Sequence, residues 1–474
     1  MLFPTITFAI FFLLVFTLNW LVMPRFRLWK WFTILVGYVF YAWWDWRFVG
    51  LLVVATLVNQ AAAQLMGRPG VGGRKAILTV AVAADLGLLG WFKYYGFFVS
   101  SLTNLLRGVG LQPSIPLFNI VLPVGISFLT FRVLSYVIDV YRGELEPAPP
   151  LDFAVYVAFF PYLLAGPIAR AAEFLPQLGQ PRDARRLDSA RAFTLIFGGL
   201  FKKMIIADYL ATHLVNGVFA DPGMHSSWET LVAIYGYTVQ IYCDFSAYSD
   251  IAIGLALLLG FRLPDNFNAP YAALSLRDFW RRWHMTLSRW LRDYLYIPLG
   301  GNRLGRRRTY VNLMATMLLG GLWHGAGWTF VFWGGMHGAG LTGERVRAAR
   351  RAALGLPPPR DTAGRRVLQR LAVFHFVALA WVFFRADSLR DAFGLLGHLF
   401  TAWGAPSPGV TWTVVGLIAL GVGVQYVPQR PLLAFQAGFS RLAPALQGVG
   451  IAFGLFVLNV LGPAGPASFL YFKF

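Results

Sequence analysis

Apolar runs of about 20 residues, the length that a helix needs to cross a bilayer, recur along nearly the whole chain. No stretch of ordinary composition remains that is long enough for a soluble domain. Hydrophobic residues make up 57% of the sequence and charged residues 13%, which is far from the balance of a soluble protein. We therefore expect an all-α, polytopic integral membrane protein in which residues 1–474 form one membrane-embedded domain of about 10 to 12 membrane helices. The first apolar run lacks a cleavage site and should persist as a helix.

The basic residues indicate an orientation. The net charge is +20, yet Lys and Arg collect in short clusters between apolar runs, as the positive-inside rule requires of cytoplasmic loops. This distribution reflects membrane topology and gives no reason to expect a nucleic-acid partner. The Arg-free segment 216–229 should face the opposite side, and the single cysteine, Cys243, excludes an internal disulfide. The expected inner segments are 25–30, 68–75, 182–191, 277–308 and 343–370.

One histidine lies in an apolar stretch that enters and leaves the membrane from the inner side. No Lys, Arg, Asp or Glu occurs between Arg308 and Glu344, and His324 lies near the middle of this interval. Sixteen residues of helix span about 24 Å, so the ring is deep, and an intramembrane ionisable residue is a functional-site candidate. A buried histidine that donates to a neighbouring carbonyl is an equally good interpretation of the residue alone.

The segment 277–294 is a second candidate, with alternating arginine and tryptophan. On one continuous helix Trp280, Trp283 and Leu287 fall on one side, Arg277 and Arg281 fall on another, and His284 lies at the border. An interfacial amphipathic helix with snorkelling arginines explains this pattern. The alternative is a helix whose arginine face, with Ser288, receives an anionic group beside a second histidine.

Two histidines flanked by tryptophan near an Arg-rich inner surface suit acyl transfer. A neutral imidazole can remove a proton from a hydroxyl as the oxygen attacks a carbonyl carbon, and burial keeps such a ring neutral. We assign His324 as the general base, or as the residue that relays the acyl group, and His284 as an assisting donor. A proton-coupled transporter or flippase with His324 as a proton relay is the alternative from another functional class.

The most distinctive stretches of the sequence are 122–128, 135–142, 165–168, 242–246, 265–271, 277–302, Leu322-Trp323-His324-Gly325 and 381–386. Together they extend from about residue 120 to 390 and resemble the membrane-bound O-acyltransferase (MBOAT) family. The resemblance is strongest to the family's bacterial branch that includes the alginate O-acetylation acyltransferase; the D-alanyl transferase of teichoic acid modification is more distant.

This resemblance implies a ring of helices around a tunnel, with re-entrant and amphipathic helices, and matches His324 and His284 to the two family histidine positions. It further implies an acyl thioester donor on the cytoplasmic side, acetyl-CoA or an acyl carrier protein, and a polysaccharide acceptor reached through a periplasmic acetyltransferase partner. The expected location is the bacterial inner membrane, and a carrier-dependent D-alanyl transferase is the alternative within the family. The expected substrate-binding residues are Arg277, Arg281, Trp280, Trp283, Ser288, Asn268, Trp323 and Trp328.

Other polar residues carry weaker expectations. His337 follows His324 by 13 positions, about 220° round a continuous helix, so it should point away and serve packing. Arg132 and Asp139 fit a charge pair or a tunnel wall equally well. Asp244 and Asp250 fit a bond to Arg or to backbone, and stabilisation of a polar seam between helices is at least as good an interpretation. No metal centre and no tightly bound cofactor are expected, because metal-binding motifs are absent from the sequence. His213, His225, His375 and His398 carry no site signal.

Overall fold

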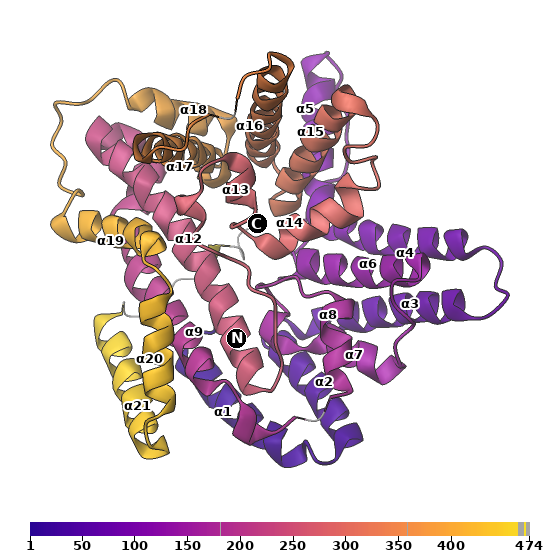
Figure 1. Ribbon diagram of the computed structural model, residues 1–474. Helices are drawn as coiled ribbons and strands as arrows, with labels where there is room; N and C mark the ends of the chain where they lie inside the picture. Colours follow the sequence, from indigo (N-terminus) through magenta and orange to yellow (C-terminus); the bar gives the residue numbers. More distant parts are fainter. Residues whose placement is uncertain (181, 358, 463–468, 471–474) are drawn as a thin grey trace. The chain divides into compact units, whose positions relative to one another are not determined.

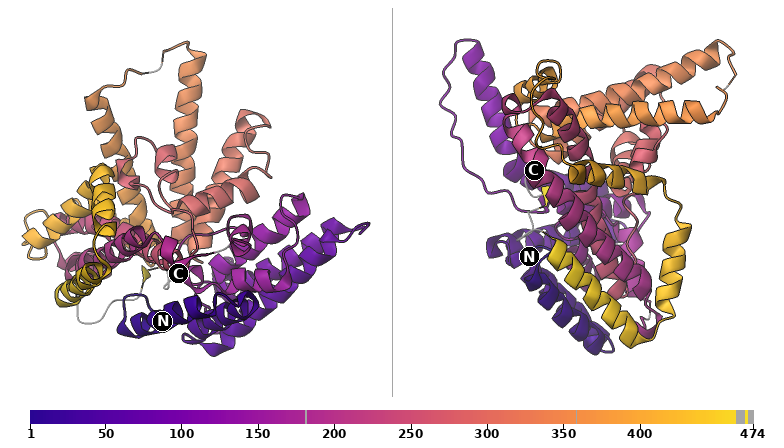
Figure 2. Two further views of the ribbon diagram at one scale, coloured as in Figure 1. Left: turned by 60° about the horizontal axis from the view of Figure 1, so that its bottom comes forward. Right: turned by 90° about the vertical axis from the view of Figure 1, so that its left-hand side faces the viewer.

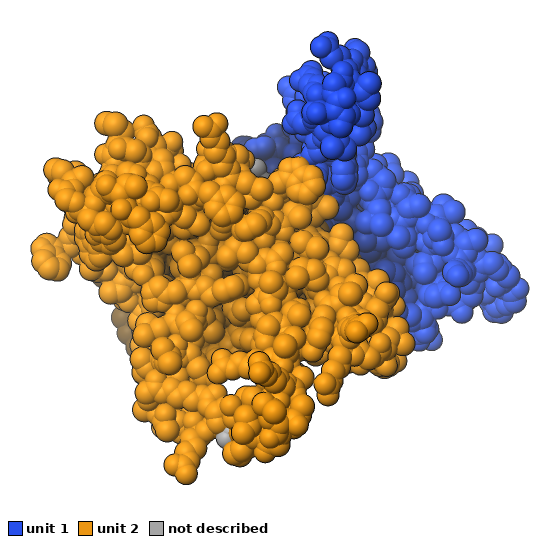
Figure 3. Space-filling model, turned by 90° about the horizontal axis from the view of Figure 1, so that it is seen from above, with its two compact units in different colours: residues 1–188, 252–264 blue, residues 189–251, 265–474 orange. Residues whose placement is uncertain are grey.

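The computed structural model describes residues 1–474 except 181, 358, 463–468 and 471–474. The described residues form helices joined by turns and loops, with no β-strand among them, which confirms the all-α fold class. They divide into two compact units, unit 1 (1–188 and 252–264) and unit 2 (189–251 and 265–474), shown in blue and orange in Figure 3. The single domain expected over residues 1–474 stays a prediction, and each unit is described by itself.

Unit 1 is a packed set of helices held by buried polar contacts. The Gln60 amide of α3 donates to the Ala148 carbonyl at 2.7 Å, and the Tyr136 hydroxyl of α6 donates to Gln60 at 3.1 Å. The Arg132 guanidinium lies 4.7 Å from the centre of the Tyr162 ring, a cation–π contact. The helices are α1 (Ile6–Val22), α2 (Phe26–Ala42), α3 (Val49–Gly67), α4 (Arg74–Leu89), α5 (Tyr95–Gly108), α6 (Ile126–Arg142), α7 (Pro150–Ala158) and α8 (Ala171–Leu178) (Figure 1).

Unit 2 contains most of the long, mostly buried helix α12 (Ser227–Leu258). The Tyr271 hydroxyl donates to the Thr238 carbonyl of this helix at 2.6 Å. The remaining helices of unit 2 are α9 (Ser189–Phe201), α10 (Asp208–Leu210), α11 (Asn216–Ala220), α13 (Leu276–Trp280), α14 (Met285–Leu291), α15 (Gly305–His324), α16 (Trp328–Ala353), α17 (Ala363–Arg385), α18 (Leu389–His398), α19 (Trp412–Gly423), α20 (Arg430–Ser440) and α21 (Pro444–Leu461).

The two acidic residues expected to pair within α12 have lysine partners, not arginine. The Lys203 ammonium lies 2.6 Å from the Asp244 carboxylate and 2.8 Å from that of Asp208, and all three side chains are buried. Lys202 pairs with Asp250 at 2.5 Å. Asp244 also accepts a hydrogen bond from the backbone N–H of Leu470, so this carboxylate has one lysine partner and one backbone partner. The paired charges explain how ionised groups are tolerated in a largely apolar helix.

Five helical segments of the described residues are long and apolar enough to cross a membrane, which confirms a multi-pass membrane protein. A pair of helices bent by 87°, Trp412–Tyr426 and Arg430–Ser440, raises the number to six if the pair is one span. The number is below the 10 to 12 expected, because several apolar windows lie in helices that are shorter, such as α1 with 17 residues. The five spans are Trp46–Gly67, Arg74–Gly108, Ser227–Leu258, Ala363–Arg385 and Pro444–Leu461.

The chain around His324 folds into the expected hairpin, formed by α15 and α16 and broken between His324 and Trp328. The two helices approach closely at two glycines. A Cβ at Gly321 would lie 2.2 Å from the Phe330 carbonyl oxygen, and one at Gly334 would lie 2.3 Å from that of Met317. Small residues at a helix interface permit such contact between backbones. After α16 the described part of the chain from Leu354 to Thr362 is exposed and leads to α17 (Figure 2).

Candidate functional site

His324 is the last residue of α15 and is buried, with 4% of its surface exposed. Aromatic rings surround it: the ring centres of Trp323, Trp333 and Phe384 lie 4.9, 5.2 and 5.3 Å away. The prediction that this ring lies inside the protein is confirmed.

The segment 277–294 is not the continuous amphipathic helix that the sequence predicted. It breaks between α13 and α14 at His284, whose backbone is left-handed with φ +41°. A π-helical turn, Arg292–Tyr296, follows α14. Periodicity assumes one helix axis and therefore missed this break, which moves His284 from the border of a surface helix to a position with no exposed surface.

The break brings the two histidines together within unit 2. Their ring centres lie 6.4 Å apart, and that of Trp323 lies 6.1 Å from His284. Burial lowers the pKa of His284 to about 3, so this ring is neutral at physiological pH. Two residues separated by 40 positions thus share one aromatic enclosure.

Asn266 holds the His284 ring on its Nδ1 side. The sequence alone did not indicate this residue as a candidate. The Asn266 side-chain oxygen lies 3.1 Å from Nδ1 of His284, and it accepts bonds from the hydroxyl and the backbone N–H of Thr286. The Asn266 amide donates to Ser249 at 3.1 Å. All these side chains are buried, so the amide sits in a fixed orientation.

Unit 2 also contains an arginine-lined cavity of about 430 Å³, and Trp280 of its lining contacts Trp333, which in turn contacts His324. Its lining includes four arginines and one acidic residue, Glu344. The Glu344 carboxylate accepts the backbone N–H groups of Leu276 and Arg277 at 2.7 and 3.2 Å and so fixes the start of α13 on α16. The four arginines are Arg277, Arg281, Arg292 and Arg345.

The cavity runs along the same face of α15 as His324. Met317 lines it and precedes His324 by seven residues, which is about two helical turns on one face. Neither histidine is part of this lining. A tunnel that continues past the histidines to the other membrane face therefore stays a prediction.

The expected substrate-binding residues fall into three groups. Arg277, Arg281, Trp280 and Ser288 line the cavity. Trp323 and Trp283 are buried in the aromatic enclosure. Trp328 is 58% exposed at the start of α16, and Asn268 is exposed, with its backbone N–H bonded to the Arg282 carbonyl at 2.9 Å. The structure thus groups six of the eight around the cavity and the histidines, and a substrate contact for each stays a prediction.

That His337 points away from His324 and serves packing stays a prediction. The helix is interrupted between them, so the angle of a continuous helix does not apply. The ring of Trp333 contacts both histidines, with its centre 5.2 Å from that of His324 and 4.9 Å from that of His337. The Trp280 indole donates to Nδ1 of His337 at 3.3 Å, which joins the cavity wall to the same cluster of rings.

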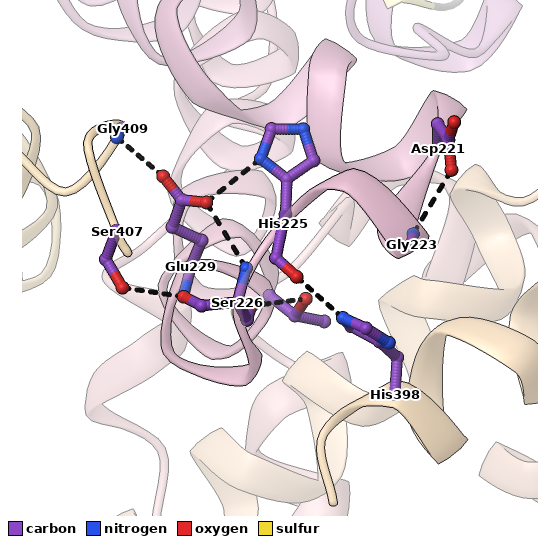
Figure 4. A network of polar contacts seen from close by, with 9 residues as sticks. Asp221, Gly223, His225, Ser226, Glu229, His398, Ser407 and Gly409 are labelled. Atoms are coloured by element: carbon purple, nitrogen blue, oxygen red, sulfur yellow. Dashed lines mark hydrogen bonds and ion pairs between the residues drawn. The ribbon is translucent and has the colours of Figure 1, made fainter. Parts of the chain in front are cut away.

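His225 and His398, which carried no site signal, lie in a separate polar network at the start of α12 (Figure 4). The Glu229 carboxylate accepts from Nδ1 of His225 at 3.0 Å and from the backbone N–H of Gly409 at 2.6 Å. His398 donates from Nε2 to the His225 carbonyl at 2.7 Å. These contacts fasten the chain before α12 to the loop between α18 and α19, a structural role.

Among the described residues, no three His, Cys, Asp or Glu side chains are grouped so that they could hold a metal ion. The chemistry available at the site is that of imidazole, amide and guanidinium groups. The absence of a metal or cofactor requirement stays a prediction.

Comparison with known sequences identifies the context of this arrangement. Residues 127–383 match the family described as MBOAT, membrane-bound O-acyltransferase family. This range contains both histidines, Asn266 and the cavity.

Individual relatives extend the match. A probable alginate O-acetylase, AlgI, of Azotobacter vinelandii is 44% identical over 77% of this chain and 71% of its own length. A peptidoglycan O-acetyltransferase of Helicobacter pylori is 36% identical over 77% of this chain and 73% of its own length. A teichoic acid D-alanyltransferase of Bacillus subtilis is 28% identical over 58% of this chain and 71% of its own length.

Proposed function

The chain belongs to the membrane-bound O-acyltransferase family, and on this basis we propose that it moves an acetyl group from a cytoplasmic thioester toward hydroxyls of an exported polysaccharide. That the protein is an O-acyltransferase follows from the family. The acetyl group and the glycan acceptor are inferred from the relatives with the greater identity and coverage, which are named for alginate and peptidoglycan O-acetylation. The proposed location is the bacterial inner membrane.

The observation that carries the proposal is the pairing of His284 and His324 close to the cavity. Four arginines and one acidic residue give the cavity a positive lining, which suits the phosphates of coenzyme A or of a carrier-protein prosthetic group. The aromatic enclosure beyond Met317 suits the uncharged acyl group. An arginine-lined pocket close to a buried pair of imidazoles provides the two environments that an acyl thioester needs, one for its phosphates and one for its acyl group.

The reaction follows from this arrangement. One imidazole of the pair removes the hydroxyl proton as the hydroxyl oxygen bonds to the acyl carbon, the carbon–sulfur bond breaks, and the proton passes to the departing thiolate. Both histidines then recover their starting protonation states. Delivery to the final glycan through a periplasmic acetyltransferase partner belongs to the same proposal.

Thioester turnover by the purified protein is the test. Wild-type protein in lipid nanodiscs should consume acetyl-CoA or acetyl carrier protein when an acceptor is present, and His324→Ala should lower the rate by about 10²- to 10⁴-fold. The exposed His213→Gln variant is the matched control and should retain activity.

Cells that carry His324→Ala, with the protein still present in the membrane, should lose ester groups from one exported glycan. Turnover of alanyl carrier protein but not acetyl donors would assign the D-alanyl reaction instead. Movement of an intact solute with no thioester consumption would refute acyl transfer.

A further inference from the structure

We propose that Asn266 is a positioning residue that holds His284 in the Nδ1–H tautomer, so that His284 takes part in acyl transfer as a hydrogen-bond acceptor through Nε2. This inference rests on the proposed function and specifies which ring nitrogen of His284 donates a hydrogen bond and which accepts one. It replaces the donating role that the sequence suggested for His284.

The direction of the hydrogen bond between Asn266 and His284 follows from the other hydrogen bonds of the Asn266 side chain. Its side-chain oxygen lies 3.3 Å from the backbone N–H of Thr286, a group that can only donate. The Thr286 hydroxyl lies 2.9 Å from the same oxygen, and the Asn266 amide nitrogen faces Ser249 at 3.1 Å. The oxygen therefore faces His284, and an oxygen of an amide can only accept.

His284 must consequently donate from Nδ1. In a neutral imidazole one nitrogen carries the proton and the other carries the lone pair, so Nε2 is the accepting atom. Burial keeps the ring neutral, and the nearest aromatic neighbours, Phe245 at 4.7 Å and Trp323 at 6.1 Å, carry no charge. His324, a titratable residue, is also among the ring contacts of His284.

The backbone shows how firmly the ring is held. His284 adopts φ +41°, which costs a non-glycine residue free energy. The Asn266 carbonyl accepts the N–H of Met285 at 2.9 Å, so the backbone and side chain of one residue hold both sides of the break. This double anchorage is what a group with a required orientation needs.

The spacing of the two histidines indicates what Nε2 accepts from. A separation of 6.4 Å between ring centres exceeds what a direct N–H···N bond between two imidazoles allows, but an oxygen bonded to both rings spans it. A hydroxyl that donates to Nε2 of His284 is thereby held against His324. The acceptor of the acyl group is the hydroxyl that this geometry orients.

Nitrogen-15 NMR of histidine-labelled protein tests the tautomer directly, with His284→Gln identifying the resonances. The expected result for wild type is a protonated Nδ1 and an unprotonated Nε2 at His284, with a mixture of tautomers in Asn266→Ala. A protonated Nε2 in wild type would overturn the proposal. This readout needs no substrate, so it stands or falls separately from the proposed acyl transfer.

The pH profile of turnover tests the consequence for function. Asn266→Asp keeps an accepting oxygen but adds a negative charge, which favours protonated His284, so its activity relative to wild type should fall as the pH is lowered from 8 to 6. Asn266→Ala should lose about 10²-fold in kcat without this added pH dependence.

Asn19→Asp is the matched control, because Asn19 is a buried asparagine whose oxygen accepts from the Trp29 indole at 2.8 Å. It places the same charge beside a group that does not titrate and should leave the pH profile of turnover unchanged. A profile for Asn266→Asp that parallels wild type would overturn the role of Asn266, even where the rate itself is reduced.

Discussion

His284 combines a left-handed backbone with a ring that has no exposed surface. A non-glycine residue in this conformation costs of order 1 to 3 kcal/mol and persists only where its surroundings over-determine it. Four hydrogen bonds to Asn266, from the ring of His284, the Met285 backbone and the Thr286 backbone and hydroxyl, supply that constraint. The strain is thus located at the residue whose ring orientation the proposed chemistry requires.

Burial of His284 should make the stability of the protein depend on pH. Burial in the folded chain lowers the pKa of His284 from 6.5 to about 3. Below pH 6.5, His284 is therefore protonated in the unfolded chain but stays neutral in the folded chain. Stability is therefore lost as the pH falls, by about 2 kcal/mol at pH 5. The apparent melting temperature of wild type should fall more between pH 7.5 and 5 than that of His284→Gln. The exposed His213→Gln variant should keep the wild-type dependence, and equal slopes for wild type and His284→Gln would contradict the burial argument.

At this scale the sequence predicted the burial of His324 and the pairing of two histidines, because the absence of charge around position 324 is visible in the chain. It did not distinguish Asn266 from Asn268, two positions on. A motif gives the order of residue types. Which of the two asparagines contacts His284 depends on the positive φ at His284, and no local sequence pattern predicts that φ. The accepting oxygen behind the ring became visible only with the fold.

The α15–α16 hairpin depends on backbone contact at particular glycines, and neighbouring glycines provide a test. A Cβ at Gly334 would lie 2.3 Å from the Met317 carbonyl oxygen, whereas one at Gly335 meets only the flexible Leu318 side chain at 3.6 Å. Gly334→Ala should destabilise the protein by about 1 to 3 kcal/mol and lower acyl transfer, because it separates the helix that ends at His324 from its partner. Gly335→Ala should leave both the melting temperature and turnover near wild type. Equal effects of the two variants would exclude close packing as the cause.

The arginines of α13 give a prediction about the donor. Arg281 lines the cavity. Arg281→Ala should remove a charge-assisted bond to a donor phosphate, which should raise the KM for the thioester donor about tenfold with little change in kcat. Arg306, at the exposed start of α15, is outside this lining, and Arg306→Ala should leave KM unchanged. If both variants raise KM equally, the donor responds to diffuse inner-side charge and not to the cavity.

The sequence predicted helices correctly where the apolar pattern was long, and the prediction failed where a helix is interrupted. The hairpin was inferred from the arginines at its two ends, and α15 and α16 confirm it. The segment 277–294 and the interval from His324 to His337 were each read as one continuous helix, and both break at a short turn. Helical periodicity carries no information about such turns when the residues on either side remain apolar or aromatic.

For the whole molecule, the distribution of charge and the described structure address different questions. Composition was sufficient for a helical multi-pass membrane protein, and the five or six candidate spans confirm it. Orientation is predicted from the arginine clusters alone, and the cavity is on the donor side only if that predicted orientation holds. The enzymatic proposal therefore depends on a property that the fold by itself does not contain.

Site-directed labelling determines that orientation. Cys243 is buried, so a Cys243→Ser background with single cysteines at Leu354 and Met224, which are 63% and 80% exposed, reports on one predicted side each. A maleimide that does not cross membranes should label Met224→Cys in intact spheroplasts and Leu354→Cys only after lysis, because Leu354 belongs to the Arg-rich segment 343–370 and Met224 to the Arg-free segment 216–229. The background variant should stay unlabelled in both states. Labelling of Leu354→Cys from outside would put the arginine-lined cavity on the acceptor side, and a cytoplasmic thioester could then not reach His284 and His324 by that route.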